Sequence, residues 1–416
     1  MKNIFKYITV ILITLTIFNC SKNDDEGAAP NQAPEAFALI AVTNNDTGVD
    51  VKPNFSWQEA VDPENDAVSY SLYVGNEADP TTLLAENISS TNYQPTERLL
   101  MYANYNWKVV AKDSKGATTT SNMFSFATRG LNIPTQAVTT NAAFSARLSH
   151  TSVVFDNKLW LIGGNDGSLK NDVWYSANGI SWTAATASAP FSGRFRHSSV
   201  VFDNKLWVIG GFDADLAQKN DVWYSADGIT WTEATANAPF SGREGHSSVV
   251  FDNKLWVIGG FDFDGAQKND VWYSADGITW TEATASAPFS GRDYHSSVVF
   301  DNKLWVIAGY DGSRKNDVWY SADGISWTAA TANAPFSGRY LHSSVVFDNK
   351  LWVIAGYDGA RKNDVWYSAD GTIWTEATAS APFSGRYLHS SVVLDNKLWV
   401  IAGNDGSGKN DVWAFD

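Results

Sequence analysis

A motif of 47 to 49 residues occurs six times between about residue 133 and the C-terminus, and it limits the possible fold more than any other feature. Each copy combines a His-Ser-Ser-Val-Val-like segment, a Leu-Trp-Val-Ile-Gly-Gly-like segment and an Asn-Asp-Val-Trp segment. A repeat of this regularity predicts a solenoid or a propeller, whose units stack on one another. The only six histidines mark the copies: His150, His197, His246, His295, His342 and His389.

Each copy predicts four short strands, because β-branched and aromatic runs alternate with Asp-Asn and Asx-Gly turns. In the second copy we expect strands over residues 198–202, 206–209, 221–225 and 231–235. A single four-stranded sheet cannot bury both of its faces, so neighbouring sheets must stack and the stack must close radially. The sequence therefore predicts an all-β fold with a six-bladed β-propeller.

The order Arg-x-x-His-Ser-Ser-Val-Val, Leu-Trp-Val-Ile-Gly-Gly, Asn-Asp-Val-Trp-Tyr and Trp-Thr resembles the kelch repeat. This resemblance implies a kelch-like propeller, which we expect over residues 131–416. In copies four to six the first glycine of the pair is replaced by Ala308, Ala355 and Ala402. Only the second glycine is therefore a candidate for an obligatory positive φ.

The sixth copy stops at Asp416, directly after its third predicted strand, and leaves the edge of its blade unpaired. The segment before the first copy has the sequence of a repeat end, since Phe144 and Arg147 match Phe240 and Arg243 in register. An open edge invites association with other chains. We therefore expect residues 131–141 to supply the outer strand of blade six.

Residues 34–130 form a second predicted domain, in which three segments alternate as half-buried strands: 55–57, 69–74 and 105–111. The early Trp57 and the later Tyr-x-Trp-x-Val-x-Ala strand resemble a fibronectin type III β-sandwich. The loop that contains Asp62, Glu64 and Asp66 offers oxygen ligands for calcium, but no full ligand set at a known spacing is visible. We expect a solvated loop and no metal.

The N-terminus predicts export and lipidation. Lys2 and Lys6 precede an apolar run over residues 8–18 that is too short to span a bilayer, which indicates a signal peptide over 1–19. Cys20, the only cysteine, stands where a bacterial lipoprotein carries its lipid, and the acidic segment after it resembles the export signal of surface lipoproteins in Bacteroidetes-type bacteria. We expect Sec export, a lipidated Cys20 with a flexible tether over 20–33, and attachment to the outer membrane or cell surface through the lipid alone. A plain secretory signal with a chance cysteine is the alternative.

The formal net charge of −15 argues against nucleic acid and anionic lipid as partners. With one cysteine there is no internal disulfide, so stability must come from core burial. We expect a monomer.

The copies differ mainly at two places: the two residues between Arg and His, and the residue after the second glycine. The start of the first strand and the loop after the second strand emerge on one face of an antiparallel blade. Kelch domains bind ligands at these positions, and loops on a rigid scaffold are where function collects. The predicted ligand-binding residues are Phe195, Arg196, Phe212, Glu244, Phe261, Asp293, Tyr294, Tyr310, Tyr340, Tyr357 and Tyr387.

These features favour a surface binding module for glycan or protein over an enzyme. The arginine and histidine of the motif repeat without variation, which a symmetric structural role explains better than catalysis. Galactose oxidases share kelch blades, but their cofactor needs a cysteine joined to a tyrosine, so we expect no cofactor. The alternative is a carbohydrate-active enzyme resembling a sialic-acid mutarotase or epimerase, with Arg196 beside Glu244 or Asp293 as acid and base.

Overall fold

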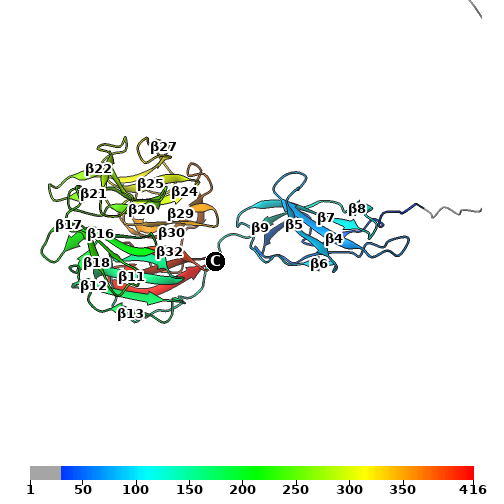
Figure 1. Ribbon diagram of the computed structural model, residues 1–416, viewed down its shortest axis with the longest axis horizontal. Helices are drawn as coiled ribbons and strands as arrows, with labels where there is room; N and C mark the ends of the chain where they lie inside the picture. Colours follow the sequence, from blue (N-terminus) through cyan, green and yellow to red (C-terminus); the bar gives the residue numbers. More distant parts are fainter. Residues whose placement is uncertain (1–29) are drawn as a thin grey trace, which may run out of the picture. The chain divides into compact units, whose positions relative to one another are not determined.

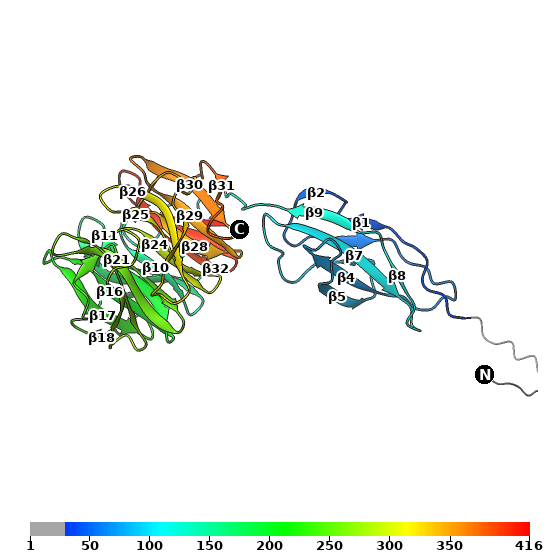
Figure 2. The same ribbon diagram turned by 90° about the horizontal axis from the view of Figure 1, so that it is seen from above.

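The computed structural model describes residues 30–416 (Figures 1 and 2). The predicted signal peptide, Cys20 and most of the predicted tether lie outside these residues. The described chain is built from strands, turns and loops, which agrees with the predicted all-β class. No helix that is long and apolar enough to cross a membrane is present between residues 30 and 416.

The described residues form two compact units. The smaller contains Asn54–Pro95, Tyr105–Phe126 and the residues up to Asn45. The larger contains Ala127–Asp416 together with the segments Asp46–Pro53 and Thr96–Asn104.

The strands before residue 129 form two sheets. One has the order β1-β3-β6, and the other has the order β2-β9-β7-β4-β5 with β8 also paired to β7. Trp57 and Trp107 are buried, and the ring of Phe55 lies 5.0 Å from that of Trp107. In β3, β4 and β7 buried residues alternate with more exposed ones, as expected of half-buried strands. The strands are β1 (Leu39–Ala41), β2 (Asp46–Val49), β3 (Phe55–Trp57), β4 (Ser69–Gly75), β5 (Leu83–Ile88), β6 (Asn92–Tyr93), β7 (Asn104–Lys112), β8 (Thr118–Thr120) and β9 (Phe124–Thr128).

Each copy of the repeat forms its own antiparallel sheet. The first three sheets contain β10 (Thr151–Phe155), β11 (Lys158–Asn165), β12 (Leu169–Ser176) and β13 (Thr183–Thr186); β14 (Arg194–Phe195), β15 (Ser198–Phe202), β16 (Lys205–Asp213), β17 (Gln218–Ser225) and β18 (Thr232–Thr235); and β19 (Arg243–Glu244), β20 (Ser247–Phe251), β21 (Lys254–Asp262), β22 (Gln267–Ser274) and β23 (Thr281–Thr284).

The remaining sheets contain β24 (Ser296–Phe300), β25 (Lys303–Tyr310), β26 (Arg314–Ser321) and β27 (Thr328–Thr331); β28 (Ser343–Phe347), β29 (Lys350–Tyr357), β30 (Arg361–Ser368) and β31 (Thr375–Thr378); and β32 (Ser390–Leu394), β33 (Lys397–Asn404) and β34 (Gly408–Phe415).

The second strand of each copy is apolar on both faces, and this is why the sheets stack. In β16, Leu206 and Val208 are fully buried together with Trp160 and Ile162 of the preceding sheet. On the opposite face, Trp207 and Ile209 belong to the core shared with the following sheet. Successive side chains of a strand point to opposite faces, so one run of apolar residues serves two interfaces.

The third turn of each copy also joins two sheets. A Cβ added to Gly228 would lie 2.1 Å from the ring of Trp160 in the preceding sheet. Gly228 also has a φ of 73°. Glycine is required here both by the turn conformation and by the tryptophan that packs on it.

The sheets close into a ring, because β10 packs against β32 as each first strand packs against the next. Leu159 and Leu161 of β11 share a core with Trp399 and Ile401 of β33, and the red strands of the last sheet lie beside β11 in Figure 1.

Residues 131–141 run along β34 but do not form a regular strand. Thr139 makes an isolated antiparallel bridge with Val412, and the amide of Val138 donates to the Val412 carbonyl at 2.8 Å. Pro134 has no N–H to donate, which restricts the pairing that the start of this segment can make. The sheet of the last copy therefore contains three strands, with this segment hydrogen-bonded along its outer edge.

Candidate functional site

The arginine of each copy is buried and holds its sheet together. Arg194 donates from both Nη atoms to Asp221, at 2.7 and 2.8 Å, and also to the Gly210 carbonyl at 2.9 Å. Asp221 accepts a further hydrogen bond from Trp223 Nε1 at 2.8 Å. Such bidentate pairs are strong and geometrically specific. The motif arginines are therefore fully engaged by the fold: Arg147, Arg194, Arg243, Arg292, Arg339 and Arg386.

The Gly-Gly pair forms a bulge beneath this arginine. The register of β16 and β17 shifts between Ile209 and Gly211, and this shift turns the Gly210 carbonyl toward Arg194. The first position of the pair has φ between 53° and 59° in every copy, including the copies with alanine. The second position has φ between 97° and 107°, and a Cβ at Gly211 would lie 2.6 Å from His197 Cβ. The second glycine is thus obligatory, as expected, but the first position is left-handed as well.

The two variable regions of each copy lie directly opposite one another. Phe195 pairs with Phe212, and Glu244 pairs with Phe261. The same pairing recurs as isolated bridges in the other copies: Leu148 with Asn165, Asp293 with Tyr310, Tyr340 with Tyr357, and Tyr387 with Asn404. The variable positions therefore meet around one mouth of the ring, which we call the variable mouth.

A closed circle of backbone hydrogen bonds surrounds the axis at this mouth. The amide of Arg196 donates to the Ser149 carbonyl, and that of Gly245 donates to the Arg196 carbonyl. All six residues of the circle have positive φ, between 53° and 62°. No residue pattern in the sequence indicated this circle, because only one of its members is glycine. Its members are Ser149, Arg196, Gly245, Tyr294, Leu341 and Leu388.

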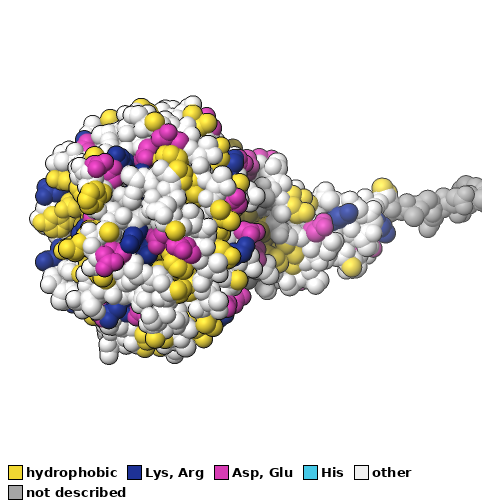
Figure 3. All heavy atoms as spheres, turned by 60° about the vertical axis from the view of Figure 1, so that its left-hand side comes forward, with side chains coloured by type: hydrophobic (Ala, Val, Ile, Leu, Met, Phe, Trp, Pro, Cys, Tyr) yellow, Lys and Arg dark blue, Asp and Glu magenta, His cyan; other side chains and the backbone are white. Residues whose placement is uncertain are grey.

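The histidines lie next to this circle and form hydrogen bonds between neighbouring sheets. His246 Nε2 lies 2.8 Å from Ser198 Oγ of the preceding copy, and Ser198 Oγ lies 2.6 Å from Ser248 Oγ. Burial, followed by the charge of Arg243, lowers the pKa of His246 to about 3. The histidine is therefore neutral at physiological pH and acts in packing. On the face shown in Figure 3 no histidine side chain is visible.

A cavity of about 130 Å³ lies between the circle and the histidines. A second cavity of about 400 Å³ continues along the axis and is lined by serines and valines of the first strands, such as Val154, Val201 and Val250. The axis is therefore polar near the variable mouth and apolar farther along.

The predicted aromatic residues form a crescent at the variable mouth. The ring of Tyr340 lies 6.0 Å from Tyr294, 5.1 Å from Tyr310 and 5.8 Å from Tyr357. Tyr357 lies 5.6 Å from Tyr387. On the other side of the mouth Phe195 contacts Phe212 edge-on at 5.6 Å. Each of these rings is half-buried, as is Phe261, so part of each remains accessible.

The predicted charged residues come together beside this crescent. Arg196 Nη1 lies 3.1 Å from Glu244 Oε2, and the guanidinium lies over the rings of Phe195 at 4.7 Å and Tyr294 at 5.0 Å. Asp293 is 5% exposed, and its Oδ1 has no hydrogen-bond partner in the described chain. Burial, and then the charge of Glu244, raises the pKa of Asp293 to about 7 against the opposing influence of its own amide and of Arg196.

The loops after β16 and β21 are two residues longer than the corresponding loops of the other copies, and they expose apolar side chains at their tips. Leu216 is 75% exposed and Phe263 is 78% exposed, and each is adjacent to an exposed aspartate, Asp215 or Asp264. These loops follow β16 and β21, whose ends carry Phe212 and Phe261. The longer loops of these two neighbouring copies thus add apolar and acidic side chains near the variable mouth.

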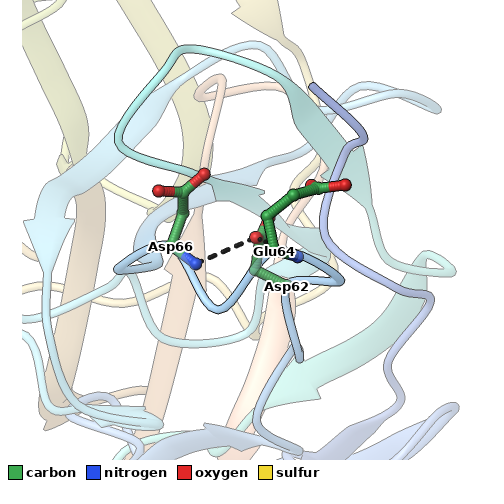
Figure 4. A group of neighbouring side chains, drawn as sticks. All are labelled: Asp62, Glu64 and Asp66. Carbon is green, nitrogen blue, oxygen red and sulfur yellow. Dashed lines mark hydrogen bonds between the residues drawn. The ribbon is translucent and has the colours of Figure 1, made fainter. Parts of the chain in front are cut away.

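The carboxylates of the smaller unit cluster, but they have partners within the protein. Asp62, Glu64 and Asp66 offer oxygen atoms within 4.8 Å of one another (Figure 4). Asp62 Oδ1 accepts hydrogen bonds from the amides of Glu64 and Asp66 at 3.0 and 2.9 Å, and these bonds hold the backbone of the loop in place. Asp66 Oδ2 lies 2.8 Å from Lys115 Nζ. The loop is therefore crosslinked by its own acidic residues.

The comparisons with known proteins agree with this geometry. A family described as the KLHDC2/KLHL20/DRC7 Kelch-repeats domain matches residues 149–329 and 264–416. No curated protein matches the sequence. A solved structure titled "Structure of YjhT" is similar in fold, with a TM-score of 0.54 and 19% sequence identity over 65% of this chain and 94% of that chain. The chain belongs to the kelch-repeat family and has its propeller fold.

Proposed function

We propose that this protein is a lipid-anchored surface protein whose six-bladed kelch propeller binds a glycan at the variable mouth. The observation that carries this proposal is the crescent of half-buried tyrosines beside Arg196, Glu244 and Asp293. Flat aromatic rings stack on sugar faces at little entropic cost. The charged groups beside the rings can accept hydrogen bonds from sugar hydroxyls, as carboxylates do, or donate hydrogen bonds to them, as a guanidinium does.

The rigidity of the mouth supports this function. The variable residues are held by cross-strand pairing and by the backbone circle, so few of them lose freedom when a ligand binds. A protein ligand is the alternative occupant, and the exposed Leu216 and Phe263 would extend its contact area.

In this proposal the other parts of the chain attach the propeller to the membrane and hold it at a distance from the membrane surface. Cys20 carries the lipid, residues 20–33 act as a tether, and residues 34–130 form a fibronectin type III-like sandwich that spaces the propeller from the outer membrane. The apolar run before Cys20 is too short to remain as a membrane helix.

An enzyme related to sialic-acid mutarotases or epimerases is the second candidate function, and it is favoured by one observation. Asp293, with a pKa of about 7, could both hold and release a proton at neutral pH beside Arg196 and Glu244.

A glycan array probed with residues 30–416 tests the binding function, and a sialic-acid anomer-exchange assay by NMR tests the enzyme. We expect array signals that Tyr340→Ala removes, and no acceleration of exchange. Exchange that is accelerated by the wild type but not by Asp293→Asn would favour the enzyme instead.

A further inference from the structure

Of the three charged side chains at the Arg–His positions of the variable mouth, two are acidic and one is basic. Arg196, the basic one, is already paired with Glu244 at 3.1 Å, and Arg314 lies over the ring of Tyr357 at 5.6 Å. The Arg196 guanidinium is also covered by the rings of Phe195 and Tyr294. Asp293 remains as a second carboxyl group without a salt-bridge partner among the described residues.

The burial of Asp293 makes its unpaired carboxyl group important for the choice of ligand. The side chain is 95% buried, its Oδ1 accepts no hydrogen bond within the described chain, and its backbone is fixed by two hydrogen bonds to Tyr310. A buried carboxylate without a partner is costly, and the cost is relieved by a proton or by a cation. A ligand that brings a cation would therefore gain more here than a ligand that brings an anion.

We infer that the variable mouth selects a sugar that carries a free ammonium group, with Asp293 as its counterion and the neighbouring tyrosine rings as its walls. This inference rests on the proposed glycan-binding function and names the class of glycan. The face of a tyrosine ring attracts cations, as the face of Tyr294 attracts the guanidinium of Arg196, and Tyr340 is the ring beside Tyr294. Asp215 and Asp264 on the longer loops and the formal net charge of −15 also favour a cationic ligand over an anionic one.

The groups around Asp293 determine how the preference depends on pH. Glu244 and Arg196 lie beside it, Tyr294 follows it in the chain, Tyr310 is its cross-strand partner, and Tyr340 is the next ring of the crescent. The carboxyl group must be ionised to pair with an ammonium. Because burial raises its pKa to about 7, the ionised fraction of Asp293 should rise from pH 5.5 to pH 7, and affinity should rise with it for a ligand whose ammonium group stays protonated over this range. A ligand that accepts a hydrogen bond from the protonated acid would show the opposite trend.

The test compares two oligosaccharides of the same linkage, one with free amines and one in which each amine is acetylated and therefore uncharged. The β-1,4-linked tetramer of glucosamine carries free amines, and the tetramer of N-acetylglucosamine has the same linkage without them. We expect calorimetry at pH 7 to show a roughly tenfold or greater preference for the free amine, since close charge pairs in desolvated sites have effects of this size or larger. In Asp293→Asn the ratio of the two affinities should approach one.

The outcomes separate this inference from the function on which it rests. Equal binding of both tetramers, tighter binding of the acetylated one, or tighter binding of a carboxylate-bearing sugar would overturn the ammonium selectivity and leave glycan binding standing. Binding of a lysine-rich peptide with no binding of any glycan would overturn the proposed function and this inference together. The comparison of the two sugars on the wild type needs no variant, so it holds even if Asp293→Asn does not fold.

Discussion

Arg196 and Glu244 belong to neighbouring copies of the repeat, and their side chains meet at 3.1 Å at the variable mouth. The other copies carry leucine, serine, glycine, phenylalanine or tyrosine at the corresponding positions, apart from Asp293. The repeat is therefore symmetric in its core and asymmetric at one end. This asymmetry concentrates all three charged side chains of the variable Arg–His positions in three consecutive copies, which is the chemical basis of the proposed site.

The buried arginine pairs should be essential for stability. Asp317→Asn would leave the guanidinium of Arg292, which is fully buried, without its counterion, and we expect a loss of about 3–5 kcal/mol in unfolding free energy. Asp301→Asn is the matched control, because its pair with Lys303 is exposed and should be worth less than about 1 kcal/mol. Urea unfolding of both variants measures the difference, and equal losses would contradict the structural role of the arginines.

The buried histidines should make the fold sensitive to mild acid. Burial lowers the pKa of His246 to about 3, below its unfolded value of about 6.5, so the folded state binds fewer protons. The stability that depends on the neutral ring is fully present above about pH 6.5 and is lost as the pH falls toward 3, by up to about 1.4 kcal/mol per pH unit for each histidine.

The number of protons taken up on unfolding near pH 5 measures this effect. We expect His246→Gln to reduce that number by about one. A wild type whose unfolding free energy is the same at pH 5 and pH 7 would show that the rings are not held neutral.

The segment before the first copy should protect the last sheet. Val138→Pro removes the amide that donates to Val412, and we expect it to lower stability by about 1–3 kcal/mol and to promote association through the exposed edge of β34. Gln136→Pro is the control, since this residue is exposed. Light scattering and thermal melts that do not distinguish the two variants would show that the ring closes independently of this segment.

Membrane attachment should depend on Cys20. Cys20→Ser removes the only thiol that could carry a lipid, and we expect the protein to appear in the soluble fraction or to remain unprocessed. Fractionation together with metabolic labelling by a fatty acid checks this expectation. Wild-type protein without label, combined with unchanged fractionation of the variant, would rule out lipid anchoring.

Much of the fold follows from the repeat, because one pattern of apolar and turn residues recurs in every copy. The strand predicted over residues 198–202 has the same limits in the structure. The second strand, predicted over 206–209, extends through Asp213, because the bulge at Gly210 and Gly211 shifts the register without ending the pairing. A bulge depends on pairing with the next strand, so the local sequence does not show it.

The geometry of the candidate site was only partly predictable from the sequence. Variation between copies located the mouth, and antiparallel geometry brought its two variable positions together. The left-handed conformation of Arg196 and Tyr294 was not predictable, because these residue types rarely adopt it and the backbone circle imposes it from outside. The pairing of Arg196 with Glu244, rather than with Asp293, depends on distances between sheets that no single copy encodes.

The binding of a glycan by Tyr340→Ala, compared with wild type, is the most direct test of the proposed site. Tyr340 contacts three other rings of the crescent yet remains half-buried, so its removal should weaken glycan binding roughly tenfold or more while costing less than the 3 kcal/mol or so of a core aromatic. Ile278→Ala, at an exposed third-turn position, should bind as the wild type does. Calorimetry with a glycan selected on the array gives both affinities, and thermal melts confirm the fold. A Tyr340→Ala protein that is folded and binds that glycan with wild-type affinity would contradict a binding site at the variable mouth.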